Sequence, residues 1–319
     1  EVQLPRVSIM GMSLGSVVAS HFAEQFPQLM DRLVLMGVMQ KTRESWRMLL
    51  EESLHLMKED RMEEFGQAVV LYLVNHARLT ETSLSPTAKR LFFKQMAAFA
   101  STERLRYEVN CNRLLRLRNV PIPTCSTLVA VGEYDSFTLP FENANFALQC
   151  PDMQFALIKH ADHLPQLERR KETMGLFATY LRGEPIDDCV GIEPMSREQI
   201  PQLERRGERR VHLVEPCRQM HHRHDPSQCH QVTVVDINFF GVLLDAATPE
   251  AAAALIAEPR DLALALGQVG EQPLAIECLI FEQMGSQVRA LFKHGYFENA
   301  ERLNLLLAGD AVVENAASL

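Results

Sequence analysis

The stretch that decides the fold is Val7-Ser8-Ile9-Met10-Gly11-Met12-Ser13-Leu14-Gly15. An apolar run enters a Gly-x-Ser-x-Gly pattern and a helix-like segment leaves it, which is the order strand, tight turn, helix. The backbone must bend sharply at Ser13, and we expect glycine at positions 11 and 15 because side chains there would collide. The hydroxyl of Ser13 then stands exposed above a helix N-terminus. This context predicts a nucleophile; the alternative interpretation is an N-cap serine between two glycines.

Length and composition limit the possible functions. A chain of 319 residues suits two domains, and a hydrophobic content of 47% supports sizeable cores. The net charge of −9 argues against a nonspecific nucleic-acid binder. The seven cysteines are odd in number and scattered, which predicts a reducing, cytoplasmic location without a disulfide framework. No apolar run approaches the roughly 18 residues of a membrane helix. Because Glu1 stands close to the first predicted strand, we expect the chain to be a fragment that lacks earlier strands.

The first half alternates predicted strands and helices, which is typical of an α/β fold with a parallel sheet. Residues 41–118 interrupt this alternation with apolar positions at helical spacing, and they predict an all-helical cap inserted over the active edge of the sheet. We expect a first strand that begins at residue 7 and enters the turn at Gly11, further strands at residues 33–36, 127–131 and 154–158, and helices at residues 14–26 and 166–181.

Three residues that follow predicted strands form a possible catalytic set. They occur in the order Ser13, Asp135 and His163, which is nucleophile, acid, base. His160 is an alternative base. Glu133 and Asp162 are alternative acids, and we otherwise interpret them as solvated loop charges.

Residues 1–184 resemble the C-terminal two thirds of the α/β-hydrolase fold with a helical cap. The matching segments are Gly-Met-Ser-Leu-Gly at 11–15, Gly-Glu-Tyr-Asp at 132–135 and Asp-His-Leu-Pro-Gln-Leu-Glu at 162–168. The resemblance implies that Ser13 attacks an acyl carbonyl, that His163 transfers its proton and that Asp135 orients the imidazole. It also implies that the backbone N–H of Leu14 is one oxyanion donor.

Two features depart from that family pattern. The family usually has glycine where Asp162 precedes the base, and its second oxyanion donor comes from a loop upstream of the serine, in a part that this sequence lacks. Because of these departures, a hydrolase domain without catalytic activity is an alternative interpretation.

The second half begins after a predicted linker at residues 185–194. A charge run contains Arg205, Arg206 and Arg210, and the segment Asp236-Ile-Asn-Phe-Phe-Gly241 lies further along between apolar runs. The pair Arg-x-x-x-Arg and Asp-x-Asn-x-x-Gly resembles the PilZ domain, a small β-barrel that binds cyclic diguanylate. Arginines clamp phosphates and stack on guanine, whereas the short polar side chains of Asp236 and Asn238 reach guanine edges. Asn238 is a departure, since the family usually has serine there.

Further patterns in residues 195–310 agree with a PilZ-like, all-β domain. Residues 274–280 alternate apolar and other side chains, residues 212–220 are interpreted as one strand, and the glycine at 241 lets a strand turn away from the ligand. We expect helices from Thr248-Pro249 onward and over residues 297–307. The predicted fold class is therefore α/β followed by all-β.

One group of cysteines and histidines resembles a metal site only by composition. It lacks Cys-x-x-Cys and His-x-x-x-His spacing, so we predict a polar hairpin without metal. The group consists of Cys217, His221, His222, His224, Cys229 and His230.

Three functional hypotheses follow. The first is a bacterial serine hydrolase of esters, thioesters or amides that is regulated by cyclic diguanylate and needs no catalytic cofactor. The second is a nucleotide-responsive adaptor whose hydrolase domain only binds a partner. The third retains Ser13 as the nucleophile of an acyltransferase.

Overall fold

The computed structural model describes residues 5–82, 84–205, 208–225, 227–270, 272–309 and 312–314. The chain divides into two units. The first unit contains residues 1–43, 72–92 and 99–207, and the second contains residues 44–71, 93–98 and 208–319. The division differs from the predicted one, because two pieces of the helical insertion belong to the second unit.

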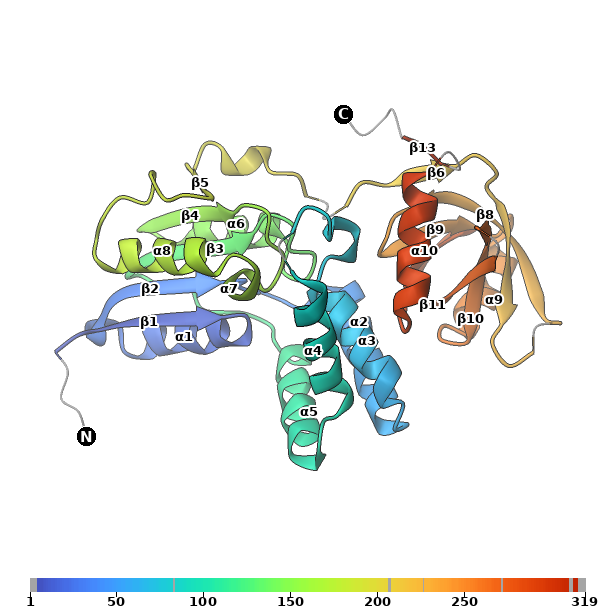
Figure 1. Ribbon diagram of the computed structural model, residues 1–319, viewed down its shortest axis with the longest axis horizontal. Helices are drawn as coiled ribbons and strands as arrows, with labels where there is room; N and C mark the ends of the chain where they lie inside the picture. The colour runs from blue at the N-terminus through green and yellow to red at the C-terminus, as the bar shows by residue number, and fades with distance from the viewer. Residues whose placement is uncertain are drawn as a thin grey trace. The chain divides into compact units, whose positions relative to one another are not determined.

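The first unit is built on a five-stranded sheet with the order β1-β2-β3-β4-β5. The first four strands are parallel, and β5 is antiparallel to β4. The strands are β1 (Val7–Met12), β2 (Met30–Met36), β3 (Ser126–Gly132), β4 (Met153–Ile158) and β5 (Ile192–Met195). The predicted strands are confirmed, and the carboxyl ends of the parallel strands meet at one edge (Figure 1).

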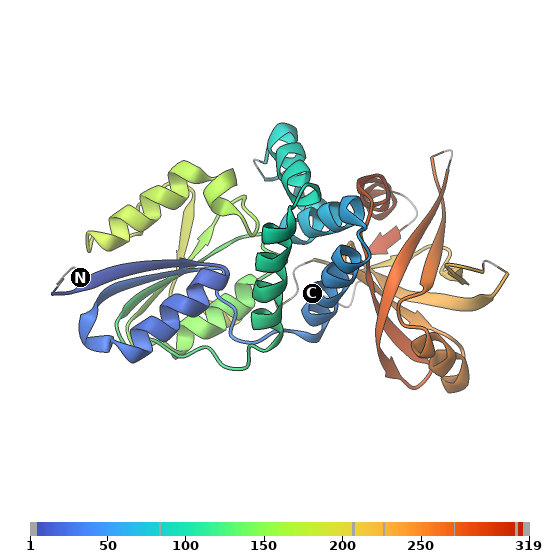
Figure 2. The same cartoon turned by 90° about the horizontal axis from the view of Figure 1, so that it is seen from below.

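Helices cover both faces of this sheet (Figures 1 and 2). Helices α1 (Leu14–Gln25) and α6 (Pro140–Gln149) pack on one face. Helix α8 (Arg170–Leu181), which follows the short α7 (Pro165–Glu168), packs on the other face. Because β2, β3 and β4 are buried on both sides, they need apolar residues at consecutive positions rather than at alternate ones.

The predicted helical insertion is helical, but it is shared between the units. It contains α2 (Glu44–Lys58), α3 (Met62–Leu73), α4 (Pro86–Ala97) and α5 (Ser101–Leu115), with a 3-10 turn, η2, at His76–Arg78. Helix α2 and most of α3 belong to the second unit, whereas α5 belongs to the first. Periodicity identified the helices but carries no information about which core their apolar faces join.

Residues 185–194, which the sequence predicts as a linker, are packed on the sheet of the first unit. The side chain of Ile186 is buried, and Ile192–Met195 is strand β5, which pairs with Phe155–Ile158 of β4. The first unit continues beyond this strand to residue 207. Buried apolar side chains at Ile186 and Ile192 outweigh the turn-forming residues around them, because removing apolar area from water stabilises the edge of the sheet.

The second unit contains a closed barrel of six antiparallel strands. The strands are paired in the order β8-β7-β10-β11-β12-β9, and β9 pairs back with β8. They are β7 (Cys217–His222), β8 (Cys229–Ile237), β9 (Gly241–Asp245), β10 (Leu262–Val269), β11 (Gln272–Met284) and β12 (Gln287–Phe292). Two short strands, β6 (Val211–Leu213) and β13 (Val312–Glu314), extend the sheet beside β8. Closure leaves the six strands without a free edge.

The expected helices of this unit are confirmed, but one expected strand is wrong. Helix α9 (Pro249–Ala257) starts at Thr248, whose hydroxyl accepts the Ala251 N–H at 3.2 Å, and α10 spans Phe297–Ala308. Residues 212–220 do not form one strand, because β6 ends at Leu213 and β7 begins at Cys217. The interruption contains Pro216, which lacks the N–H that a continuous strand pairing needs.

A buried ion network joins α2 to the barrel within the second unit. Glu52, which is 1% exposed, contacts Arg260 at 2.7 Å and the ammonium of Lys293 at 3.2 Å. Lys293 also donates to the carbonyl of Arg260 at 2.7 Å and lies 3.4 Å from Glu277. Each buried charge is therefore compensated by an opposite charge or a carbonyl.

None of the helices in the described ranges has the length and apolar character that crossing a bilayer requires. All seven cysteines lie in those ranges, and each is a free thiol.

We expect Glu52→Ala to lower the free energy of unfolding by about 3 kcal/mol, because the buried Lys293 ammonium would lose its nearer carboxylate and keep only Glu277 at 3.4 Å. Glu51→Ala is the matched control, since Glu51 lies 3.5 Å from the same Arg260 but is 41% exposed, and its loss should cost about 0–1 kcal/mol. Urea unfolding of both variants measures the difference. Equal costs for the two substitutions would contradict a buried network.

Candidate active site

The turn between β1 and α1 holds Ser13 in an unusual backbone conformation. Its φ is 51° and its ψ is −123°, a region that residues with a side chain adopt only when the surrounding structure holds them there. The Ser13 N–H donates to the Met36 carbonyl at 2.8 Å, so β2 fixes the turn from outside. The Ser16 amide and hydroxyl both donate to the Ser13 carbonyl, at 2.9 and 2.5 Å. The bend that the sequence predicts is therefore present.

The two glycines of the turn have different roles. A Cβ at Gly11 would lie 2.5 Å from the Gly15 carbonyl oxygen and 2.7 Å from the Ser16 Cα, so no side chain fits there. A Cβ at Gly15 meets no atom within 4 Å. The steric reason expected for both glycines holds for Gly11 and is wrong for Gly15, because the strand approaches the helix only at residue 11.

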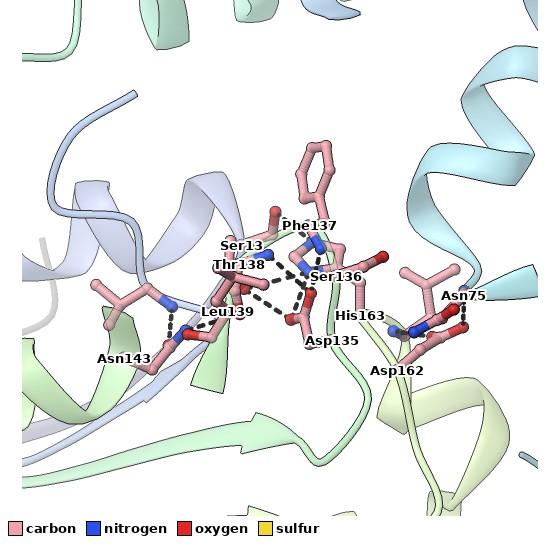
Figure 3. A network of polar contacts seen from close by, with 12 residues as sticks. Ser13, Asn75, Asp135, Ser136, Phe137, Thr138, Leu139, Asn143, Asp162 and His163 are labelled. Atoms are coloured by element: carbon pink, nitrogen blue, oxygen red, sulfur yellow. Dashed lines mark hydrogen bonds and ion pairs between the residues drawn. The ribbon is translucent and has the colours of Figure 1, made fainter. Parts of the chain in front are cut away.

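The side chains of Ser13, His163 and Asp135 form one hydrogen-bonded chain (Figure 3). His163 Nε2 lies 3.0 Å from Ser13 Oγ, and its Nδ1 lies 2.9 Å from Asp135 Oδ2. His163 and Asp135 are 5% and 2% exposed. Both follow parallel strands, β4 and β3, which explains how residues far apart in sequence meet at one edge of the sheet.

The Asp135 carboxylate is held rigidly. Its Oδ1 accepts the Phe137 N–H at 2.9 Å and the Thr138 N–H at 2.7 Å, and its Oδ2 accepts the Thr138 hydroxyl at 2.7 Å. The Phe137 ring meets the His163 ring edge-on, with centroids 4.6 Å apart. These contacts leave the carboxylate one orientation, in which it faces the imidazole.

Leu14 is the first residue of α1. The N–H groups of a first helical turn have no partner within the helix and can donate hydrogen bonds to a negatively charged oxygen nearby. Leu14 therefore stands, by position, where the sequence predicts an oxyanion donor.

The alternative base and acids have other partners. His160 has a φ of 56°, and its ring lies 6.3 Å from the Tyr134 ring. Glu133 accepts from the Lys159 ammonium at 2.6 Å and from the His160 N–H at 3.0 Å. Neither residue takes part in the hydrogen-bonded chain that contains Ser13.

Asp162 is not a solvated loop charge, as the sequence suggested, because it is only 1% exposed. Its Oδ2 accepts the Asn75 N–H at 2.9 Å, and its Oδ1 accepts the Leu164 N–H at 3.0 Å. Sequence reasoning missed this role, since nothing in the local pattern indicates that Asn75 of the insertion reaches Asp162.

Glu168 is a second buried carboxyl group, five residues after His163 in the chain. Its Oε2 accepts the Asp162 N–H at 2.7 Å. Burial and the neighbouring Asp162 charge raise the pKa of Glu168 to about 9. Burial also raises the pKa of Asp162, with a smaller contribution from Asp135. Burial and the neighbouring charge therefore favour the neutral form of the Glu168 carboxyl group. The only sequence signal for Glu168 was its place in the segment that resembles the hydrolase family.

The residues of the predicted nucleotide motif are partly brought together in the second unit. Arg210 forms an ion pair with Asp236. Asn238 Oδ1 accepts the N–H groups of Phe240 and Gly241 at 3.0 Å, and its Nδ2 donates to the Glu208 carbonyl at 3.4 Å.

The remaining three motif positions do not support the predicted nucleotide site in the second unit. Arg205 belongs to the first unit, where its guanidinium lies 5.2 Å from the centre of the Phe141 ring. Arg206 lies outside the described residues. Gly241 is required by the barrel itself, because a Cβ there would lie 2.5 Å from the Ala290 carbonyl oxygen of the paired strand β12.

The cysteines and histidines around residues 217–230 do not converge. Within the described ranges, no group of three or more His, Cys, Asp or Glu side chains is arranged to hold a metal ion.

Comparison with known proteins assigns the segment that contains this site to a family. A profile of the alpha/beta hydrolase fold family matches residues 2–170, which is more than half of the chain. No curated protein sequence matches.

Solved structures of similar fold have low sequence identity. An esterase from Thermogutta terrifontis is 20% identical with a TM-score of 0.45, over 56% of this chain and 65% of its own. A 2-hydroxy-6-oxo-6-phenylhexa-2,4-dienoate hydrolase from a Rhodococcus species is 17% identical with a TM-score of 0.46, over 56% of this chain and 64% of its own. The chain thus spans just under two thirds of the length of these two proteins.

The geometry of the turn predicts opposite results for the two glycines. Gly11→Ala should lower the free energy of unfolding by about 1–3 kcal/mol, because its methyl group meets backbone atoms that cannot move aside. Gly15→Ala should be neutral or stabilising by up to about 1 kcal/mol, since alanine is the better helix former. Urea unfolding of the two variants tests this, and a destabilised Gly15→Ala protein would contradict the open space at residue 15.

The carboxyl pair predicts a pH dependence of stability. Because the pKa of Glu168 is raised in the folded state, its contribution is complete below the ordinary glutamate pKa and is lost as pH rises through about 9. Glu168→Gln removes this titration but keeps a donor and an acceptor, so the fall in unfolding free energy between pH 5 and 9 should become flatter.

Glu168→Ala is the contrasting variant. It leaves the Asp162 N–H without its acceptor, and this should cost about 1–3 kcal/mol at any pH. Urea unfolding at several pH values compares both variants with the wild type. A Glu168→Gln protein with an unchanged pH slope would contradict a proton on Glu168.

Proposed function

This chain belongs to the alpha/beta hydrolase fold family, and on that premise we propose that its first unit is a serine hydrolase of ester, thioester or amide acyl groups. The observation that carries the proposal is the hydrogen-bonded chain from Ser13 through His163 to Asp135. A serine held at positive φ beside an imidazole, with a buried carboxylate behind it, is an arrangement suited to nucleophilic acyl transfer.

The distances in this chain support the following chemistry. Ser13 Oγ attacks the acyl carbonyl carbon while His163 Nε2, 3.0 Å away, takes the hydroxyl proton. The backbone N–H of Leu14 donates a hydrogen bond to the developing oxyanion. His163 then gives the proton to the leaving group, which departs as an alcohol, thiol or amine and leaves an acyl ester on Ser13. Water, deprotonated by the same imidazole, hydrolyses that ester. Asp135 holds Nδ1 of His163 and stabilises the imidazolium form.

We further propose that the second unit is a PilZ-like domain that binds cyclic diguanylate and regulates the enzyme. Its support is a six-stranded antiparallel barrel in which Arg210 meets Asp236 and in which Asn238 folds the following turn. The ligand would exchange the Asp236 carboxylate for a phosphate at Arg210, which arginine binds in bidentate geometry. We place the enzyme in the cytoplasm, where its free thiols stay reduced.

A fluorophosphonate probe tests the hydrolase proposal, because it forms a covalent bond only with an activated serine. The wild-type protein should be labelled at Ser13, and Ser13→Ala should abolish labelling, whereas Ser8→Ala should not. His163→Asn should lower the labelling rate by a factor of about 100 or more, and His160→Asn, the matched control, should leave it unchanged. Absence of labelling in the wild type would instead favour the non-catalytic adaptor.

Calorimetry with cyclic diguanylate tests the second proposal. Arg210→Ala should weaken binding about 10- to 150-fold, since it removes a charge-assisted contact worth about 1.5–3 kcal/mol. Arg289→Ala is the control, because it removes an equal charge from β12 of the same barrel, where the arginine pairs with Glu282. No binding by the wild type would contradict the regulatory proposal.

A further inference from the structure

One residue of the helical insertion contacts both loops that carry the candidate catalytic acid and base. The Asn75 backbone N–H donates to Asp162 Oδ2 at 2.9 Å, and Asp162 directly precedes His163. The Asn75 side-chain Nδ2 donates to the Tyr134 carbonyl at 2.9 Å, and Tyr134 directly precedes Asp135. Figure 3 shows Asn75 and Asp162 side by side next to His163. Asn75 is only 1% exposed, and its contact with Asp162 is buried, whereas its contact with Tyr134 is partly buried.

The two catalytic loops are also packed closely on each other. The Tyr134 N–H donates to the Ala161 carbonyl at 2.8 Å. A Cβ at Gly132 would lie 2.0 Å from the Asp162 carbonyl oxygen, so the β3 loop and the β4 loop touch along their backbones. In such a tight arrangement, a contact that fixes residues 134 and 162 also fixes the separation of the Asp135 and His163 side chains.

We propose that Asn75 and Asp162 are positioning residues that hold His163 and Asp135 at hydrogen-bond distance. The insertion supplies the donor, and the carboxylate that stands where the family usually has glycine supplies the acceptor. This inference rests on the proposed hydrolase function. Asn75 reaches neither Ser13 nor substrate in this role; it acts through the two loops.

The backbone conformation of Asn75 allows the key hydrogen bond to be removed by substitution. Its φ is −67°, close to the value at which proline is fixed, so Asn75→Pro keeps this dihedral. The substitution deletes the side-chain amide and replaces the N–H by a ring methylene, which cannot donate a hydrogen bond and displaces the Asp162 carboxylate. Asn75→Ala is the matched control, because it deletes the amide that reaches Tyr134 and keeps the N–H that reaches Asp162.

The test compares kcat and KM for p-nitrophenyl acetate in the full chain, together with the rate of fluorophosphonate labelling. Asn75→Pro should lower kcat and the labelling rate about tenfold relative to Asn75→Ala, with KM within about twofold, because a misplaced base affects the chemical step rather than substrate binding. Asp162→Asn should lower kcat similarly, since an amide keeps only one of the two acceptor oxygens. This second variant keeps the test valid if the proline variant does not fold.

The outcomes separate this inference from the function on which it rests. If the wild type is labelled at Ser13 while Asn75→Pro matches Asn75→Ala and Asp162→Asn matches the wild type, the positioning role is wrong and the hydrolase proposal stands. If the wild type is not labelled, both are overturned. A fall in kcat that is matched by an equal rise in KM would also overturn the positioning role.

Discussion

The backbone bend at Ser13 is the constraint on which the first unit depends. A positive φ at a residue with a side chain persists only because its surroundings hold it, and here the Met36 carbonyl and the start of α1 do so. The bend requires close approach of the strand and the helix, and glycine at position 11 permits that approach. It also directs the serine hydroxyl to the edge of the sheet at which the neighbouring parallel strands end.

The elements around that bend explain how the Asp135 and His163 side chains are held in place. Asp135 is fixed by hydrogen bonds from its own loop, and the His163 ring is held by Asp135 Oδ2. The raised pKa of Glu168 lets its carboxyl group stay buried beside Asp162 in the neutral form. Asn75, which follows α3 closely in the chain, adds the insertion to this framework.

The order of elements and the main catalytic candidates could be predicted from the sequence. Consecutive apolar residues mark β2, β3 and β4, and a polar residue after each of two such runs marks the acid and the base. Alternation in β11 and the Thr248-Pro249 start of α9 are equally local signals. The boundary between the units had no local signal in the sequence. Strand β5 and Ile186 are held by contacts with the sheet rather than by the propensities of their own residues.

The sequence by itself determined the strand-turn-helix motif at Ser13 and the places of Asp135 and His163 after predicted strands, because each of these signals depends on residues within a few positions of one another. Tertiary structure alone decided that His163 rather than His160 reaches the serine, that Asp162 is buried, and that Arg205 and Arg210 lie in different units. The physical reason is that burial and hydrogen-bond partners come from segments distant in the chain. The sequence does not distinguish an aspartate that faces water from one that, like Asp162, accepts the backbone amide of Asn75 in the insertion.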